Sequence, residues 1–315
     1  MALTITTWNV QNLASGDDVF EEKIDFLAST LEGLGADIIA LQEILDSAAL
    51  DALAERLGFQ QVAAEPDGRG NRVGFLTRTA HSHAENVRDW RLPAGVQVRR
   101  FDDQGNVTIL EQLSRPPLKI TVQHEGREID IINAHLKSKL LTFGGNFSTR
   151  NETLRAHTAY FALERRAAEA ATLREHATEL LGAGRDLIVL GDFNDGPEAA
   201  TTQMLYGKPG SQPRGPEDAT HAAGAFQRAD AGDAQRLFNV TKLVDEPVRW
   251  TRRHNGQNEL LDQILCSAGL MPRSGGLRQV PSVTILNEDT PGIFGEHPTV
   301  SGIVPDHAPV TATFV

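Results

Sequence analysis

Short apolar runs recur along the whole 315-residue chain, and several of them end directly in polar or charged residues. Runs of this length between turn signals are typical of β-strands that are buried in a sheet. We expect strands over Leu3–Val10, Ala36–Leu41, Arg72–Arg78, Leu118–Gln123, Glu128–His135, Asp186–Leu190, Val248–Arg252, Leu260–Cys266 and Pro309–Val315. Because these strands come from both ends of the chain, the core has to be a sheet structure that brings the two ends together.

Amphipathic segments between the strands predict helices over Phe20–Leu34 and Ala48–Leu57. A longer segment, Asn151–Leu181, is rich in Ala, Glu, Arg and Leu and predicts one long helix or two consecutive ones. Residues 206–235 and 269–305 are rich in Gly and Pro, and we expect irregular loops there. The simplest organisation is one α+β domain over residues 1–315.

Composition and charge limit the classes of protein to which the chain can belong. Hydrophobic residues make up 40% and charged residues 23%, as in ordinary soluble globular proteins. The 30 Lys and Arg against 42 Asp and Glu give a net charge of −12, which excludes a protein that coats nucleic acid through overall positive charge. An enzyme that acts on a polyanion at a local site is not excluded. The single cysteine, Cys266, rules out an internal disulfide or a multi-cysteine metal cluster.

Nothing in the sequence predicts a membrane span or a signal peptide. No segment approaches the roughly 20 apolar residues that a spanning helix needs. The expected strand at Leu3 follows directly after Met1-Ala2. We therefore expect a cytoplasmic protein, with an exported origin left open in case a signal segment has been removed.

Six groups of polar residues stand where the expected strands end or begin. They are WNVQN (Trp8–Asn12), LQE (Leu41–Glu43), NAHLKSK (Asn133–Lys139), GDFND (Gly191–Asp195), LDQIL (Leu261–Leu265) and DHAPV (Asp306–Val310). Each group alone has a structural explanation, since Asn is common in turns and an isolated Asp can mark a β-bulge. The functional interpretation comes from their number and their order.

Several of these groups are suited to catalysis or to binding a cation. A carboxylate directly after a buried strand, such as Glu43, is costly unless it is paired or holds a cation. Asp192 and Asn194 are two residues apart, so they project to the same side if the strand continues. Asp306 precedes His307 and can orient its imidazole ring.

Together the six groups resemble the motifs of the endonuclease/exonuclease/phosphatase superfamily, which includes deoxyribonuclease I-like nucleases, AP endonucleases, neutral sphingomyelinases and inositol polyphosphate 5-phosphatases. The resemblance extends from Trp8 to Val310, and GDFN followed by a late DHxPV is its most specific part. It implies a four-layer α/β/β/α sandwich in which two mixed β-sheets lie face to face with helices outside. This architecture agrees with the expected order of strands and helices.

The resemblance also implies a bound Mg²⁺ or Mn²⁺ ion. Glu43 matches the principal metal ligand of the family, and Asn9 and Asp306 would lie beside it, directly or through water. Oxygen ligands of this kind suit Mg²⁺, which keeps several waters and shares phosphate oxygens. His307 would be oriented by Asp306 or by Asp262.

The remaining roles implied by the resemblance concern the reacting phosphate. Asp192 and Asn194 would position the attacking water and the phosphate, and His135 would donate a hydrogen bond to a non-bridging oxygen. His307 is the acid–base or phosphate-stabilising histidine of these enzymes. Whether Asp192 or His307 takes the proton from water is left open by the sequence.

The expected activity is metal-dependent hydrolysis of phosphodiesters, most simply of DNA or RNA, by in-line attack of water, with no obligate protein partner. HLKSK and the later Arg166–Ala170 resemble bacterial nuclease-like members, and we expect Lys137 and Arg166 to bind substrate phosphate. The alternative is an enzyme for small or lipid phosphoesters, for which Phe143 and Phe147 offer a weak match to a membrane-contacting hairpin. A binding module without catalysis is a third hypothesis, disfavoured because each motif keeps the expected residue types.

Two segments are basic although the chain is acidic. Residues 69–100 hold seven Arg against Glu85 and Asp89, and residues 137–176 hold seven Lys or Arg against four Glu. These segments either flank a groove for a phosphate backbone or form solvated faces with Glu–Arg pairs along the long helix. The sequence does not decide between the two.

Overall fold

The computed structural model describes residues 2–78, 83–86, 91–101, 107–113, 115–143, 146–206, 233–271, 273–274, 277–289 and 302–315. Most of the loop expected at 206–235 lies outside the described residues, as do residues 290–301 of the second Gly/Pro-rich stretch.

The first of two six-stranded sheets contains both chain ends. Its strand order is β17 (Ser282–Ile285), β18 (Val310–Phe314), β1 (Leu3–Leu13), β2 (Ile38–Ile44), β4 (Arg72–Thr77) and β3 (Gln60–Ala63). β1 and β2 are parallel, whereas the other neighbours in this sheet are antiparallel. The first and last strands expected from the sequence are therefore adjacent, with Ile5 opposite Ala312.

The second sheet is also mixed. Its order is β11 (Leu237–Asn239), β14 (Asp262–Ser267), β10 (Asp186–Asp192), β9 (Arg127–His135), β8 (Leu118–His124) and β5 (His83–Asn86). β9 and β10 form its parallel pair. Three two-stranded ribbons complete the described strands: β6 (Val98–Phe101) with β7 (Val107–Leu110), β12 (Arg252–His254) with β13 (Gln257–Glu259), and β15 (Arg273–Ser274) with β16 (Leu277–Arg278).

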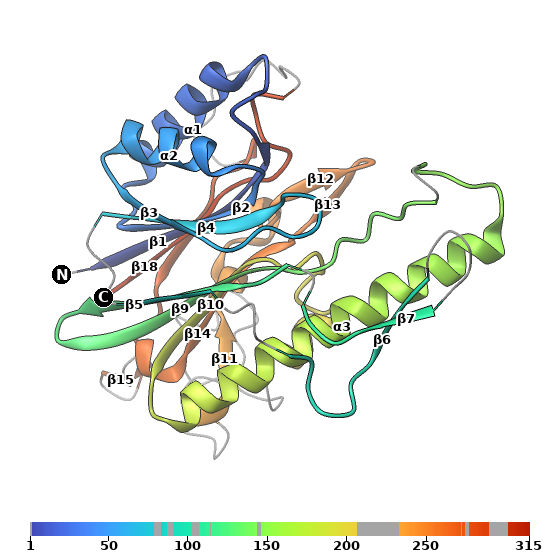
Figure 1. The fold of residues 1–315 in the computed structure, drawn as a ribbon. Coiled ribbons are helices and arrows are strands. Elements are labelled where there is room, and N and C mark those ends of the chain that lie inside the picture. Colours follow the sequence, from blue (N-terminus) through green and yellow to red (C-terminus); the bar gives the residue numbers. More distant parts are fainter. Residues whose placement is uncertain are drawn as a thin grey trace.

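Helices cover the outer faces of both sheets (Figure 1). α1 (Phe20–Leu34) and α2 (Ser47–Leu57) pack on the first sheet through Ile24, Leu27, Leu50 and related side chains. α3 (Glu152–Gly182) and α4 (Ala200–Tyr206) pack on the second. Short 3₁₀ helices lie at Asp233–Gln235, Val240–Leu243, Glu246–Val248 and Ala268–Leu270. The predicted four-layer sandwich is confirmed.

Local sequence signals account for the ends of the helices. Asp46 accepts a hydrogen bond from the Ala49 backbone N–H and caps the start of α2. Gly58 ends α2 with φ of 69°, a left-handed conformation that glycine adopts without strain. The segment predicted as one helix or two is a single helix, α3, whose first turn is capped by Asn151.

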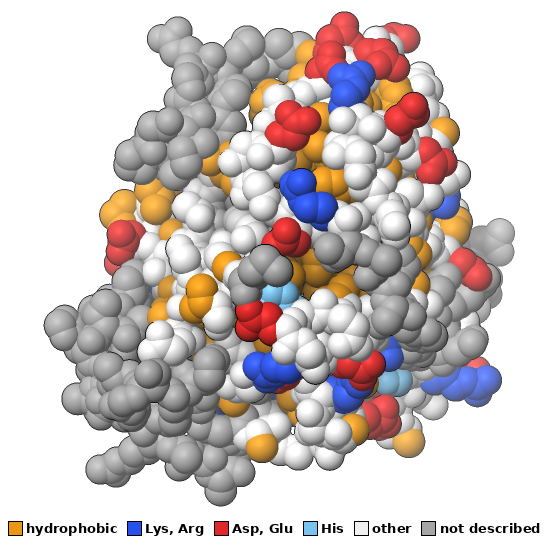
Figure 2. Space-filling model, turned by 90° about the vertical axis from the view of Figure 1, so that its left-hand side faces the viewer, with side chains coloured by type: hydrophobic (Ala, Val, Ile, Leu, Met, Phe, Trp, Pro, Cys, Tyr) orange, Lys and Arg blue, Asp and Glu red, His pale blue; other side chains and the backbone are white. Residues whose placement is uncertain are grey.

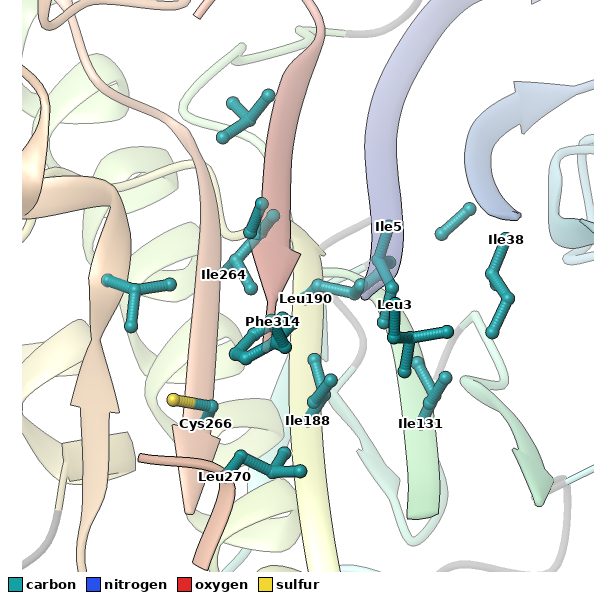
Figure 3. Close-up of a cluster of buried hydrophobic side chains, with 14 of the residues drawn as sticks. Leu3, Ile5, Ile38, Ile131, Ile188, Leu190, Ile264, Cys266, Leu270 and Phe314 are labelled. Carbon is teal, nitrogen blue, oxygen red and sulfur yellow. The ribbon is translucent and has the colours of Figure 1, made fainter. Parts of the chain in front are cut away.

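The core lies between the two sheets (Figure 3). Leu3 and Ile5 of β1 and Ile38 of β2 face Ile131, Ile188 and Leu190 of the second sheet, and all are buried. Side chains alternate along each strand, so the neighbouring Trp8 and Val10 point outward to α1. Burial of this apolar surface is the main source of stability.

The same alternation places polar side chains between the sheets at one edge. Every second side chain of a strand faces the core. In β1 this series continues from Ile5 to Asn9, and in β10 it continues from Leu190 to Asp192. These positions lie at the strand ends away from the chain termini (Figure 1). On the face that carries the termini, acidic and basic side chains are interspersed (Figure 2).

The strand predicted over Val248–Arg252 is wrong. The structure has a 3₁₀ turn at Glu246–Val248, and β12 begins only at Arg252. Pro247 lacks the N–H that a strand needs, and the carbonyls of Val248 and Trp250 accept hydrogen bonds from the Asn287 amide instead. The Asn287 side chain thus satisfies the first part of this run, and pairing with Glu259 of β13 starts at Thr251.

Helices within the described ranges are too short or too polar to cross a membrane.

Candidate active site

Asn9 links the two sheets at the polar edge. Its side-chain nitrogen donates to Glu43 Oε1 at 3.1 Å and to Asp192 Oδ2 at 3.0 Å. Its oxygen accepts the backbone N–H of Gln11 at 3.0 Å. The predicted Asn9, Glu43 and Asp192 are therefore in direct contact, and in this arrangement Asn9 presents nitrogen, not oxygen, to the Glu43 carboxylate.

His307 and Asp262 form a buried pair. His307 Nδ1 lies 2.6 Å from Asp262 Oδ2, and the side chains are 5% and 0% exposed. The indole N–H of Trp8 donates to the His307 carbonyl at 2.7 Å and fixes the backbone. Of the two carboxylates considered from the sequence, Asp262 holds the ring. The isolated Asp in an apolar run is thus explained by its position opposite the histidine.

The pKa values of His307 and Asp192 are both raised, for different reasons. Burial by itself would lower the pKa of His307, but Asp262 and Asp192 outweigh it and raise the pKa to about 10. Burial, together with the Asp262 charge, raises the pKa of Asp192 to about 6. His307 is consequently an imidazolium at neutral pH, able to donate a hydrogen bond to an anion.

His135 is buried beside Asp192 and Glu43. Its Nε2 lies 3.5 Å from Asp192 Oδ2 and 3.9 Å from Glu43 Oε1. Burial, and then the charges of Arg115 and His307, lower its pKa well below the ordinary value. His135 is therefore a neutral imidazole, and its Nδ1 has no hydrogen-bond partner among the described residues.

The GDFND segment turns sharply after β10. Gly191 has φ of 130°, and a Cβ there would overlap the Ala134 carbonyl of β9. The Asn194 backbone N–H donates to Asp192 Oδ1 at 2.8 Å, and its side chain donates to the Leu136 carbonyl at 3.0 Å. This turn fixes Asp192 and joins the loops that follow β9 and β10.

Backbone strain is concentrated at the same edge. Gln11, Asn12, Glu43 and Asn194 have φ between 50° and 64°, a range that is uncommon for residues other than glycine. The Asn12 N–H donates to Glu43 Oε2 at 3.1 Å. Strained backbone of this kind persists where surrounding contacts hold it, often at functional sites.

Lys23 of α1 is one such contact, and sequence reasoning missed it. It is 3% exposed and donates to the Gln11 carbonyl at 2.5 Å. Burial lowers its pKa, while Asp17, Glu43 and Asp306 oppose the change. Lys23 directly precedes the apolar face of the helix, and nothing in the sequence indicates that its side chain is buried.

Asp306 lies at the rim of the site. Its side chain is 38% exposed and accepts from Arg252 Nε at 3.2 Å, and its backbone N–H donates to Gln11 Oε1 at 3.1 Å. Its charge acts on Lys23 together with that of Glu43. The predicted metal ligands Glu43 and Asp306 thus lie around the same lysine.

The donor atoms are suited to a hard divalent cation. Glu43 is 22% exposed and accepts one hydrogen bond on each carboxylate oxygen, which leaves lone pairs for a ligand role. The ligand atoms of Asp192, Asp262 and His307 lie within 4.8 Å of one another, and Asp262 Oδ1 has no hydrogen-bond partner in the described structure. This second group therefore offers further ligand atoms for a cation, with Asp262 Oδ2 already held by His307.

The two predicted phosphate-binding cations contact the protein itself. Arg166 Nε donates to Asp195 at 2.7 Å, its NH1 donates to the Lys137 carbonyl at 3.0 Å, and the side chain is 7% exposed. Lys137 Nζ donates to the Ser138 carbonyl, the Ser138 hydroxyl and the Leu140 carbonyl. These contacts support the loops that carry His135 and GDFND, and the phosphate-binding roles stay predictions.

Several charges of the basic segments are paired. Arg155 contacts Glu152 and Arg165 contacts Glu169 along α3, and Arg99 from β6 contacts Glu164. These pairs agree with the Glu–Arg pairing considered for the long helix.

A buried amide bridge lies under the site. Gln42 Nε2 of β2 donates to Asn133 Oδ1 of β9 at 2.7 Å, and Asn133 Nδ2 donates to the Leu41 and Gly74 carbonyls of the first sheet. Both residues belong to motifs noted in the sequence, but their role in joining the sheets was not predicted. The bridge fixes the spacing between the strands that carry Glu43 and His135.

Comparisons with known proteins identify the family of the chain. The family model "Endonuclease/Exonuclease/phosphatase family" matches residues 6–284, and no curated protein matches the sequence. Among solved structures, a Bacteroides vulgatus endonuclease/exonuclease/phosphatase aligns at 15% identity and TM-score 0.59, over 100% of this chain and 99% of its own.

Two further structures share the fold. Truncated Caenorhabditis elegans TDP2 aligns at 13% identity and TM-score 0.58, over 99% of this chain and 97% of that one. D. rerio TDP2, complexed with a single-strand DNA product, aligns at 16% identity and TM-score 0.55, over 100% and 99%. At these identities the likeness concerns the fold, and the family model covers most of the sequence. The chain belongs to the endonuclease/exonuclease/phosphatase family.

Proposed function

We propose that the protein is a divalent-metal-dependent phosphodiesterase and that it cleaves DNA or RNA. Family membership supports a hydrolase that acts on phosphoester bonds. The observation that carries the proposal is the meeting of Glu43, Asp192 and the His307–Asp262 pair at one edge of the sandwich. A phosphodiester is an anion that repels its nucleophile, so its hydrolysis requires both charge neutralisation and a positioned water.

The proposed cation, Mg²⁺ or Mn²⁺, would be held by Glu43, with Asp306 contributing directly or through water. When bound, it would supply positive charge to the phosphate oxygens and thereby stabilise the transition state. Asn9 would act through its amide nitrogen, which keeps Glu43 and Asp192 in fixed positions. For Asn9 to bind the metal directly, its side-chain amide would have to rotate so that the oxygen faces the cation.

The other residues would act on the phosphate and on the attacking water. His307, held protonated between Asp262 and Asp192, would donate a hydrogen bond to a phosphate oxygen. Asp192, fixed by Asn9 and by the Asn194 N–H, would orient the water and accept its proton. His135 would contact a non-bridging oxygen, and Asn194 would hold the loop beside it.

A nucleic acid is the substrate we favour, because a structural neighbour, D. rerio TDP2, was solved with a single-strand DNA product. A hydrolysis panel tests the proposal: bis-p-nitrophenyl phosphate, single-stranded and plasmid DNA, RNA, sphingomyelin and inositol phosphates, each with Mg²⁺, Mn²⁺ or EDTA. We expect metal-dependent cleavage of the generic diester and of at least one nucleic acid. Cleavage of sphingomyelin or inositol phosphates without cleavage of nucleic acid would overturn the substrate assignment.

A further inference from the structure

Three guanidinium groups from separate segments lie around the loop that follows His135, and the roles proposed above do not use them. Arg69 is in the loop between β3 and β4, Arg115 precedes β8, and Arg165 is on α3. We propose that Arg69, Arg115 and Arg165 form a second phosphate subsite, which binds the phosphate next to the scissile one on a nucleotide strand. This inference rests on the proposed function and specifies the substrate class of the same site.

Asp67 holds the first two of these arginines together. Arg115 Nε donates to Asp67 Oδ2 at 3.3 Å, and the backbone N–H of Arg69 donates to Asp67 Oδ1 at 2.8 Å. Arg115 NH1 also reaches the His135 carbonyl at 3.4 Å. Arg115 is therefore fixed against the backbone of a proposed catalytic residue, while the residue Arg69 is exposed next to it.

Glu169 holds the third arginine. Its side chain is 5% exposed and accepts the Lys137 backbone N–H at 2.7 Å and Arg165 Nε at 3.2 Å. Since Lys137 is two residues after His135, Arg165 is kept beside the same loop. The hydrogen bonds found in the described ranges engage Arg165 through Nε, so its terminal nitrogens are available to an anion.

The same arginines act on the nearby Lys137 amine. The Lys137 amine is turned toward its own loop, where it donates to Ser138 and Leu140. Burial, and then the charges of Arg165, Arg115 and Arg69, lower the pKa of Lys137 to about 8 against the opposing charge of Glu169. Four cations therefore surround two carboxylates, Asp67 and Glu169, and a bound phosphate would relieve the remaining repulsion.

The part of the site near Lys23 is more acidic. A cavity of about 380 Å³ beside Asn12 is lined by Asp17, Asp18 and Lys23, among others, and Asp306 lies near the same lysine. Two acidic side chains against one lysine disfavour a phosphate there. The two flanks thus differ in charge, and a strand that carries several phosphates is best accommodated with its flanking phosphate on the His135 side.

Dinucleotides provide a direct test. We would measure kcat/KM with Mg²⁺ for TpT, pTpT and TpTp, in the wild type, in the Arg69→Gln/Arg165→Gln double variant and in Arg155→Gln. Arg155 is a matched control because it lies on α3 and pairs with Glu152 at the exposed end of the helix. The wild type should cleave one of the end-phosphorylated forms about tenfold better than TpT, the ratio expected for a charged hydrogen-bond contact. That ratio should fall to about 1 in the double variant and persist in Arg155→Gln.

The outcomes separate this inference from the proposed function. If neither terminal phosphate raises kcat/KM, or if the double variant keeps the full ratio, the subsite is wrong although the enzyme cleaves diesters. If no diester is cleaved by the wild type with any metal, the proposed function itself fails. In that case binding of TpT, pTpT and TpTp by calorimetry still tests the subsite, because pTpT or TpTp should bind more tightly than TpT in the wild type and in Arg155→Gln but not in the double variant. Thermal unfolding of each variant identifies any loss of fold.

Discussion

At the scale of single residues, the site depends on the direction in which each side chain leaves its strand. Asn9, His135, Asp192 and Asp262 occupy inward-facing positions that, nearer the middle of the same strands, hold apolar core residues such as Ile5 and Leu190. The polar cluster is therefore a continuation of the core pattern, with the carboxylates paired by Asn9 and His307. Burial without such partners would be destabilising.

Sequence motifs pointed to these residues and placed Asn9 beside Glu43, but they did not specify which atoms meet. Asn9 was expected near the metal, and the structure places its nitrogen between two carboxylates. Lys23 and Arg115 were not singled out, because a basic residue outside a motif gives no sign of the tertiary contacts it makes. Distances of this kind depend on how the two sheets pack, which local patterns do not specify.

Gly191 should be intolerant of a side chain. Gly191→Ala would place a Cβ against the Ala134 carbonyl at a left-handed φ, and we expect the free energy of unfolding to fall by more than about 1 kcal/mol. Gly182→Ala is the control, since it ends α3 with open space around it and should be neutral or stabilising. Urea unfolding of both variants measures the difference. Equal stabilities would show that the loop relaxes without cost.

At the scale of elements, segments with a strong hydrophobic periodicity were predicted correctly, whereas short edge strands were not. The strands of the two parallel pairs and all three long helices lie within a few residues of their predicted ranges. β3, β11 and β17 have three or four residues and owe their structure to pairing with longer strands. The strand predicted over Val248–Arg252 begins too early, because Asn287 satisfies the carbonyls of Val248 and Trp250 and pairing with β13 starts at Thr251.

Asp130 joins three neighbouring elements and should make stability depend on pH. It is buried on β9 and accepts from Thr121 of β8 at 2.6 Å and from Arg185, which precedes β10, at 2.8 Å. Burial acts to raise its pKa, but the hydrogen bonds and charge of Arg185, together with Thr121, outweigh burial and lower the pKa below 3.8. The pKa of Asp130 is lower in the folded state than in the unfolded state. Its contribution to stability is therefore complete when the pH is above the pKa of the unfolded state, and it is lost as the pH falls through the pKa of the folded state.

We therefore expect Asp130→Asn to reduce the free energy of unfolding at pH 7 by about 1–3 kcal/mol and by less at pH 3. Urea unfolding at both pH values measures this. Asp51→Asn is the control, because Asp51 is exposed on α2 and the amide keeps an oxygen for Gln61. A loss of the same size at pH 7 and at pH 3 would contradict the account.

At the scale of the whole molecule, the two sheets meet through apolar side chains in the middle and through polar ones at the edge. Asn9 and Glu43 come from the first sheet, and Asp192 and His135 from the second. The four-layer arrangement was expected from the family resemblance, since strand order and the pairing of sheets are not encoded in local periodicity. The structure adds the Gln42–Asn133 bridge, which connects the sheets beneath the site.

Metal binding should accordingly stabilise the whole fold. A cation at Glu43 that binds the folded state alone raises the free energy of unfolding by about 2.7 kcal/mol at a concentration 100 times its Kd. Mg²⁺ or Mn²⁺ should therefore raise the Tm of the wild type and of Glu55→Gln, an exposed control on α2, but not of Glu43→Gln. An equal rise in all three proteins would show that Glu43 does not hold the metal.

The central claim is that the polar edge is a metal-dependent phosphodiesterase site, and hydrolysis of bis-p-nitrophenyl phosphate tests it most directly. The assay compares the wild type, His307→Ala and Arg56→Gln, a control on the outer helix α2, with and without Mg²⁺ or Mn²⁺. We predict metal-dependent turnover in the wild type and the control, and a loss of about 10²–10⁴-fold in kcat for His307→Ala. Turnover that needs no metal, or that is unchanged in a folded His307→Ala variant, would contradict the account.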